Sequence, residues 1–250
     1  MESPIRSETL TSKLIFLLVF IFSPVLVFCH AAFPANLRVV REDGIEYRAA
    51  DSVAEDAFKR AQFVVRQMTW ASPKILEKMA AAGFRVEIIG QDQVLTDLPD
   101  YVDLKGKKTR DGRDFDTGTR GVGSRKMCSV GEENLLCLRH QRYWQEDVFV
   151  HEFSHSMMQY LDEDDLRNLE AAYQNAVDKE LYPKEIYMMS TSGEYWAEGV
   201  QAWLDVTLRT DANGGFNTQQ KIRDHDERLA AVLEKVYGSR QLQHSPGCAY

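Results

Sequence analysis

The sequence predicts an α+β domain, with a small mixed sheet on its N-terminal side followed by a helical half. Two observations support this class. Most segments with the alternation typical of strands lie before residue 90, whereas four segments with helical periodicity follow residue 145. A parallel α/β domain would instead alternate strands and helices along its whole length. We therefore expect strands early in the chain and helices late.

The elements of the first half follow from local signals. Residues 37–47 alternate around a Glu-Asp-Gly turn, which is typical of a hairpin. Pro73 suits the first turn of a helix, and Gly83 suits the position that follows its end. The expected elements are the hairpin, a helix capped by Asp51 or Ser52 that runs toward Trp70, a helix from Pro73 that closes at Gly83, and strands over 84–90 and 134–138.

The middle and the end of the chain differ in character. Residues 92–123 are polar and rich in glycine and aspartate, so we expect a long loop or a set of turns there. Beyond it the chain is expected to be mostly helical. The four expected helices span 146–160, 162–179, 192–208 and 217–237.

The N-terminal segment resembles a secretory signal. Residues 14–28 are apolar and uncharged, and this stretch is shorter than the roughly 20 residues that a membrane span needs. Small residues precede a candidate cleavage site after Ala31. We expect a signal peptide over 1–31, and a single secreted domain over 32–250 with no stable membrane association after cleavage. An uncleaved anchor is the alternative, because the basic residues near the N-terminus are balanced by acidic ones.

The charge of the chain excludes one class of partner. The formal net charge is −8, and no basic run occurs. Proteins that bind nucleic acid concentrate positive charge on one surface, so a nucleic-acid partner is not expected. The sequence gives no indication of the oligomeric state.

The cysteines suggest one disulfide. Cys29 would leave with the signal peptide, and in an oxidising compartment Cys128 and Cys137 can close a small loop. Cys248 would then be unpaired or would form an intermolecular bond. The alternative is three free thiols.

Residues 148–157, VFVHEFSHSM, contain the pattern H-E-x-x-H. Residues four apart lie one turn up the same face of a helix, so His151 and His155 can point two imidazoles at one ion, with Glu152 beside them. The opposite face carries an apolar stripe at a spacing of four: Phe149, Phe153, Met157 and Leu161. The alternative is an ordinary buried helix that matches this short pattern by chance.

A catalytic zinc site needs a third protein ligand and an open position for water. The metzincin arrangement is excluded, because Met158 and Leu161 occupy the positions where it requires glycine and histidine. Residues 190–205 offer Glu194 and Glu198, one helical turn apart. Glu194 also has a structural alternative, because Thr191-x-x-Glu194 is a capping-box pattern in which the carboxylate only accepts from a backbone N–H. Glu198 could likewise be a solvated surface charge.

Taken together, HEFSH, the segment EYWAE at 194–198, and Tyr187 seven residues before Glu194 resemble the catalytic domain of anthrax lethal factor-type zinc metallopeptidases. These enzymes are gluzincins, in which the third zinc ligand is a glutamate. The resemblance covers about residues 50–237 and extends to small secreted relatives of that group. It implies a zincin-like fold.

The resemblance also implies roles for individual residues. Glu152 would be the general base, Tyr187 would donate a hydrogen bond near the zinc, and Glu198 would be a carboxylate behind a ligand imidazole. One zinc ion would be bound, and its implied ligands are His151, His155 and Glu194.

The sequence therefore predicts a secreted zinc-dependent endopeptidase that acts on a protein or peptide substrate. Two alternatives stay open. One is a zinc hydrolase that acts on another amide, such as a cell-wall peptide. The other is a non-catalytic secreted protein that binds zinc.

Overall fold

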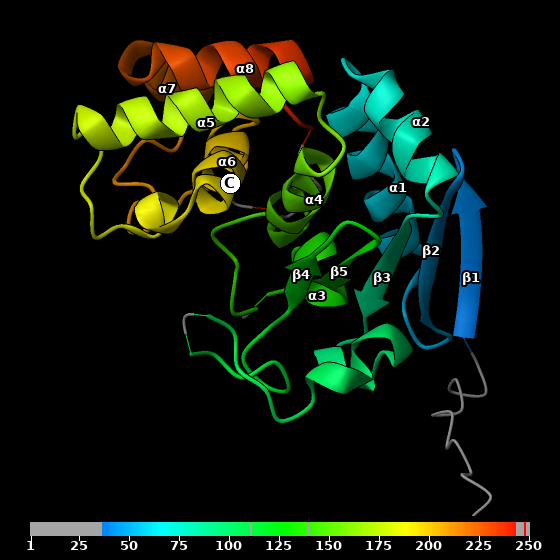
Figure 1. Cartoon of the computed structure of the whole chain (residues 1–250). Helices are drawn as coiled ribbons and strands as arrows, with labels where there is room; N and C mark the ends of the chain where they lie inside the picture. The colour runs from blue at the N-terminus through cyan, green and yellow to red at the C-terminus, as the bar shows by residue number, and fades with distance from the viewer. Residues whose placement is uncertain (1–36, 111, 140, 244–247, 249–250) are drawn as a thin grey trace, which may run out of the picture. The chain divides into compact units, whose positions relative to one another are not determined.

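A computed structural model of the chain describes residues 37–110, 112–139, 141–243 and 248 (Figure 1). All of them belong to the unit Phe33–Tyr250. The expected signal peptide over 1–31 lies outside the described residues, so its cleavage stays a prediction. Within the described part, no helix has the length and apolar character that a bilayer span requires.

Five strands form one mixed sheet in the order β1-β2-β3-β5-β4. The β1–β2 pair is the expected hairpin, β3 is parallel to β2 and to β5, and β4 is antiparallel to β5 at the sheet edge. The strands are β1 Leu37–Glu42, β2 Ile45–Ala50, β3 Arg85–Ile89, β4 Gly121–Gly123 and β5 Met127–Gly131. The predicted α+β class is confirmed, because this sheet precedes a helical half.

Eight α-helices accompany the sheet in the described residues: α1 Glu55–Thr69, α2 Pro73–Ala81, α3 Glu132–Leu135, α4 Val148–Met158, α5 Glu163–Asp178, α6 Ser192–Trp203, α7 Gln219–His225 and α8 Glu227–Tyr237. The two longest helices of the second half of the chain, α5 and α6, pack against each other and against α8 (Figure 1). The helix expected over 217–237 is divided at Asp226, because the Asp226 side chain accepts from Leu229 N–H and so begins α8 there.

Both faces of the sheet are covered. On one face Val86, Ile88 and Val130 join the main core, to which α1, α4 and α6 contribute. On the other face Ile89 packs against Leu95, Leu98 and Tyr101 in a smaller cluster. Leu95 and Tyr101 belong to two 3₁₀ turns, Leu95–Asp97 and Pro99–Leu104, and Leu98 joins these turns inside the segment that was expected to be a loop.

The strand expected over 134–138 is wrong, because that segment begins within α3 and the neighbouring strand is β5. The physical reason is the number of buried polar bonds that this segment makes. The Asn134 amide nitrogen donates to the carbonyls of Tyr143 (3.2 Å) and Glu146 (2.8 Å), and its oxygen accepts from Val148 N–H at 2.8 Å. Asn134 thereby holds the first turn of α4.

The cap expected for α1 is also different. The helix begins at Glu55 after Ala54, and neither Asp51 nor Ser52 caps it. Instead, the Glu132 carboxylate of α3 accepts from Ala54 N–H at 2.8 Å. A residue far along the chain therefore satisfies this helix end.

The predicted Cys128–Cys137 bridge is wrong, because Cys137 is bonded to Cys248 across 111 residues, with Cα atoms 5.0 Å apart. Cys248 is therefore neither unpaired nor intermolecular. Cys128 is fully buried in β5 within the main core, where burial raises the pKa of its thiol. Cys128 is thus a core residue with a free thiol, whereas Cys137 lies beyond α3.

One buried carboxyl group predicts a pH dependence of stability. Glu87 on β3 is 2% exposed, and burial together with the adjacent Asp100 raises its pKa to about 8. The unfolded value is about 4.3, so the folded state keeps a proton that the unfolded state releases between these pH values. Glu87 therefore lowers stability as pH rises through this window, by at most about 1.4 kcal/mol per pH unit.

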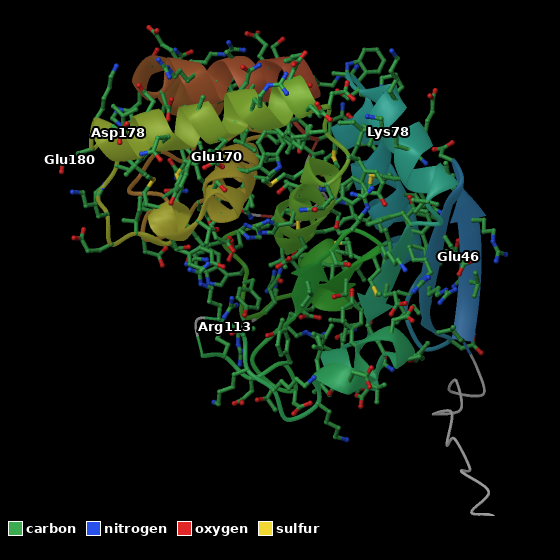
Figure 2. All side chains as sticks on the ribbon, in the orientation of Figure 1. Glu46, Lys78, Arg113, Glu170, Asp178 and Glu180 are labelled. Atoms are coloured by element: carbon green, nitrogen blue, oxygen red, sulfur yellow. A yellow bond between two sulfur atoms is a disulfide. The ribbon has the colours of Figure 1, made fainter. Side chains whose placement is uncertain are left out.

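We expect the Glu87→Gln variant to lack this dependence. Its free energy of unfolding in urea, minus that of the parent chain, should increase from pH 5 to pH 8. Glu170→Gln, which makes the same replacement on the exposed face of α5, is the control with which the Glu87→Gln trend is compared (Figure 2). The same trend in both variants, or a difference for Glu87→Gln that is constant with pH, would contradict the assignment.

Candidate metal site

Helix α4 presents the H-E-x-x-H residues on one face and its apolar stripe on the other. The Asp147 side chain accepts from Val150 N–H at 3.0 Å and caps the helix. Three residues of the expected stripe are fully buried in the core: Phe149, Phe153 and Met157. Leu161 lies beyond the end of the helix at Met158 and is 7% exposed.

Helix α6 carries Glu194 in its first turn. The Thr191 hydroxyl oxygen accepts from Glu194 N–H at 3.0 Å, which is one half of the capping-box pattern. The Glu194 carboxylate does not complete the box. It lies against the imidazoles of α4, with Oε2 3.2 Å from His151 Nε2 and 3.4 Å from His155 Nε2.

These three residues form a compact triangle of ligand atoms. The two Nε2 atoms of His151 and His155 are 3.2 Å apart, and all three candidate ligand atoms lie within 4.8 Å of one another. A tetrahedral zinc ion with ligands at 2.0–2.1 Å has ligand-to-ligand separations of about 3.3–3.4 Å. The donor set and its spacing therefore fit one such ion.

The charges around the triangle favour a cation. Burial opposes charge on the His151 ring, yet the hydrogen bond to Glu194 and the charges of Glu152 and Glu198 raise its pKa to about 10. Burial likewise opposes charge on Glu194, but the two imidazoles hold the pKa of this carboxyl far below its usual range. The surrounding carboxylates thus stabilise a positive charge at this site.

The residue that accepts a hydrogen bond from His151 Nδ1 was not predicted from the sequence. Gln201 Oε1 lies 3.1 Å from His151 Nδ1, whereas the predicted acceptor, Glu198, lies 3.8 Å from it. Gln201 is fully buried, and its amide nitrogen donates to Asp147 O (3.0 Å) and to Glu146 Oε2 (3.3 Å). With its amide fixed in this way, Gln201 accepts from Nδ1–H, which leaves Nε2 as the ring nitrogen that could bind a metal ion.

Glu198 occupies a different environment from the one expected. It is 1% exposed, and burial raises its pKa to about 7. Neither of its carboxylate oxygens has a hydrogen-bond partner among the described residues. It lines a recess of about 300 Å³ that also borders His151, Glu152 and Tyr187.

Glu152 is held by the edge strand. Its Oε2 accepts from Gly123 N–H of β4 at 2.8 Å. A Cβ atom at position 123 would lie 2.1 Å from the Glu152 carbonyl oxygen, and one at position 121 would lie 2.8 Å from Val148 Cγ1. Only glycine therefore allows β4 to approach α4 this closely, a constraint that the sequence reasoning did not recognise.

Tyr187 lies beside the ligand triangle. Its ring stacks on that of His151, with centroids 6.4 Å apart and planes at 26°. Burial, and then the charge of Glu194, raise the pKa of its hydroxyl well above the usual range. The hydroxyl is therefore protonated at neutral pH and can donate a hydrogen bond.

A groove of about 670 Å³, here called the β4 groove, runs between the edge strand and the start of α6. Its lining includes Arg110, Arg113, Gly121, Gly123, Arg125, Glu152, His155, Tyr187 and Glu194. Two of the three candidate ligands, His155 and Glu194, and the edge strand thus face the same open space.

In sequence, the chain matches no protein-family model and no curated protein. Among solved structures it is similar to a Pro-Pro endopeptidase from Paenibacillus alvei, with a TM-score of 0.48 and 16% identity. The match covers 76% of this chain and 96% of the endopeptidase. A likeness at this level does not establish a shared activity.

Proposed function

We propose that the chain is a secreted zinc-dependent endopeptidase, with one zinc ion held by His151, His155 and Glu194. The observation that carries the proposal is the triangle of two imidazole nitrogens and one carboxylate oxygen, with sides of 3.2, 3.2 and 3.4 Å. Two histidines and one glutamate are the ligand set of hydrolytic zinc sites. Two of these ligands, His155 and Glu194, line the β4 groove.

We also propose the finer relationship to lethal factor-type gluzincins. It is supported by the H-E-x-x-H pattern and by the spacing of Tyr187, Glu194 and Glu198 in the sequence. The proximity of Tyr187 to His151 is consistent with it. No family model contributes to this assignment.

When bound, zinc supplies Lewis acidity, which polarises a substrate carbonyl and lowers the pKa of a coordinated water to about 7. Glu152 lies beside the ligands without belonging to them, and its carboxylate is fixed by Gly123 N–H. We propose that it accepts a proton from the attacking water and later passes it to the departing amine. The Tyr187 hydroxyl would donate a hydrogen bond to the developing oxyanion.

A peptide substrate is favoured by the edge strand. Ser124 N–H donates to Met127 O, and Gly131 N–H donates to Arg120 O, so alternate residues of the β4 segment bond toward β5. The backbone groups of Gly121 and the carbonyl of Gly123 consequently point away from β5, whereas Gly123 N–H is already bonded to Glu152. An extended peptide could add to this edge through main-chain hydrogen bonds, without strong demands on its sequence.

Secretion is proposed on two grounds. The apolar segment over 14–28 has the length and flanking residues of a signal core. The Cys137–Cys248 bond is typical of proteins that fold in an oxidising compartment.

The direct test is metal analysis of matched variants. We expect the parent chain to hold about one zinc ion, and we expect His155→Ala and Glu194→Gln to lose it. Glu170→Gln, which changes an exposed helical glutamate, should keep the ion (Figure 2). Zinc retention in both site variants would overturn the proposed ligand set.

Activity assays separate the remaining alternatives. Unfolded casein and cell-wall fragments are incubated with the parent chain, with and without a chelator. Chelator-sensitive cleavage of casein supports the endopeptidase, whereas cleavage of the cell-wall fragments alone supports a hydrolase of another amide. Bound zinc without cleavage of either substrate would indicate a binding protein.

A further inference from the structure

The rim of the β4 groove is basic although the chain is acidic. Three exposed arginines line the groove, Arg110, Arg113 and Arg125, on a chain with a formal net charge of −8. Arg110 and Arg113 come from the loop before β4, in which Figure 2 labels Arg113, and Arg125 comes from the turn between β4 and β5. Cations from two separate segments therefore border one open space.

Carboxylates within the groove are already engaged. Glu194 lies against two imidazoles, and Glu152 accepts from Gly123 N–H. If a divalent zinc ion is bound as proposed above, its charge balances these two carboxylates. The charges of Arg110 and Arg125 can then face the bound peptide.

The acidic residues of the loop before β4 bind groups other than the rim arginines. Asp114 pairs with Lys108 at 3.2 Å, and Asp116 accepts from the Thr96 hydroxyl at 2.5 Å and from Gly106 N–H at 2.8 Å. Neither carboxylate therefore neutralises Arg110, which has no carboxylate partner among the described residues.

Arg125 is held in place by neutral groups. Its guanidinium donates to Gln159 O at 3.1 Å, at the C-terminal end of α4, and lies 5.2 Å from the centroid of the Tyr160 ring. In return, the Tyr160 hydroxyl donates to the Arg125 carbonyl at 2.5 Å. These contacts orient the side chain and leave its positive charge available to a ligand.

We infer that the β4 groove selects acidic peptide segments, with Asp or Glu residues flanking the bond to be cleaved. This inference rests on the proposed function and adds a substrate class to it. An exposed cation attracts a mobile acidic chain through the solvent, and several cations of one sign along a groove raise both the encounter rate and the affinity. The preference must therefore weaken as salt screens the charges.

The test uses three peptide libraries that share a randomised centre and differ only in their flanks, which are acidic, neutral or basic. Binding of fluorescent peptides to the zinc-loaded Glu152→Gln chain is measured by anisotropy, and cleavage is measured with the parent chain. At low salt we expect acidic flanks to exceed basic flanks by on the order of 10-fold in both assays. At about 0.5 M NaCl this ratio should fall toward one.

Charge reversal identifies the residues responsible. The double variant Arg110→Glu/Arg125→Glu should bind and cleave the basic library better than the acidic library, which is the reverse of the order in the parent chain. The control Lys74→Glu/Lys179→Glu makes the same change in net charge on α2 and at the end of α5. Neither lysine forms an ion pair with a described residue, and neither lines the groove. It should leave the order as in the parent chain.

The results of these assays distinguish a failure of this inference from a failure of the proposed endopeptidase function. Equal binding of the acidic and basic libraries, or an equal effect of the two double variants, overturns the inference even if casein is cleaved. Acidic binding that depends on Arg110 and Arg125, without cleavage of any library, supports the inference and contradicts the endopeptidase.

Discussion

Replacing Glu152 with glutamine should remove peptide cleavage while leaving the zinc content near one equivalent. Loss of a general acid–base group lowers kcat/KM by about 10²–10⁴-fold. Glu152 is not one of the three candidate ligands, and its contact is to Gly123 N–H at 2.8 Å. A glutamine side chain can keep that contact through its amide oxygen, but it cannot take a proton from water.

Three measurements check this expectation. Zinc content and the free energy of unfolding should match those of the parent chain, so that the loss is confined to the chemical step. Rates on casein are compared with those of Glu170→Gln, in which the same change is made on the exposed face of α5. A Glu152→Gln chain that cleaves as fast as the parent would rule out Glu152 as the general base.

Replacing Gly123 with alanine should damage both stability and activity. The added Cβ would lie 2.1 Å from the Glu152 carbonyl oxygen and 3.0 Å from His155 Cβ. Since both neighbours belong to a packed helix, β4 must move away from α4, and we expect a cost of about 1–3 kcal/mol, as for other overpacked sites. The movement also separates Gly123 N–H from the Glu152 carboxylate, so cleavage should fall more than stability alone explains.

Gly106→Ala is the matched control. Gly106 has a φ of +72°, but a Cβ there meets no atom within 4 Å. Its replacement therefore costs backbone strain of about 1–2 kcal/mol without a steric contact. Urea unfolding and kcat/KM on casein are measured for both variants at a temperature where both are folded. If the two variants lose equal activity, the close approach of β4 to α4 is not what positions Glu152.

Local periodicity was enough to predict most of the fold. The spacing of four in Phe149, Phe153 and Met157 identified a helix with one buried face, and the structure buries all three side chains. The hairpin, the helix that begins at Pro73 and the strand before Gly90 also follow from signals within a few residues of each element. Patterns of this kind depend on neighbours in the chain, which the sequence displays directly.

The errors share a physical cause, which is long-range pairing. Ala54 is capped by Glu132, and Asn134 belongs to a helix because its amide binds backbone groups near α4. Cys137 finds its partner 111 residues away. No local pattern contains these partners, so the short apolar run after Asn134 was interpreted as a strand.

The candidate site also contains both residues that were predicted from local patterns and residues that were missed. His151, His155 and Glu194 were predicted from motif spacing and resemblance, and their ligand atoms do meet. Gln201 and Gly123 were missed, although a glutamine seven residues after Glu194 lies on the same helical face. A signal for Gly123 was present in the R-G-V-G segment, but its meaning depends on the contact with α4.

The close packing of β4 on α4 has a consequence for natural variation. Every amino-acid replacement at codon 121 or 123 adds at least one carbon atom where the helix leaves no space. Orthologues that keep the helix-to-strand spacing should therefore carry glycine at both positions, even where the flanking arginines differ. Population missense alleles at these two codons are expected to be loss-of-function alleles, whichever residue they introduce.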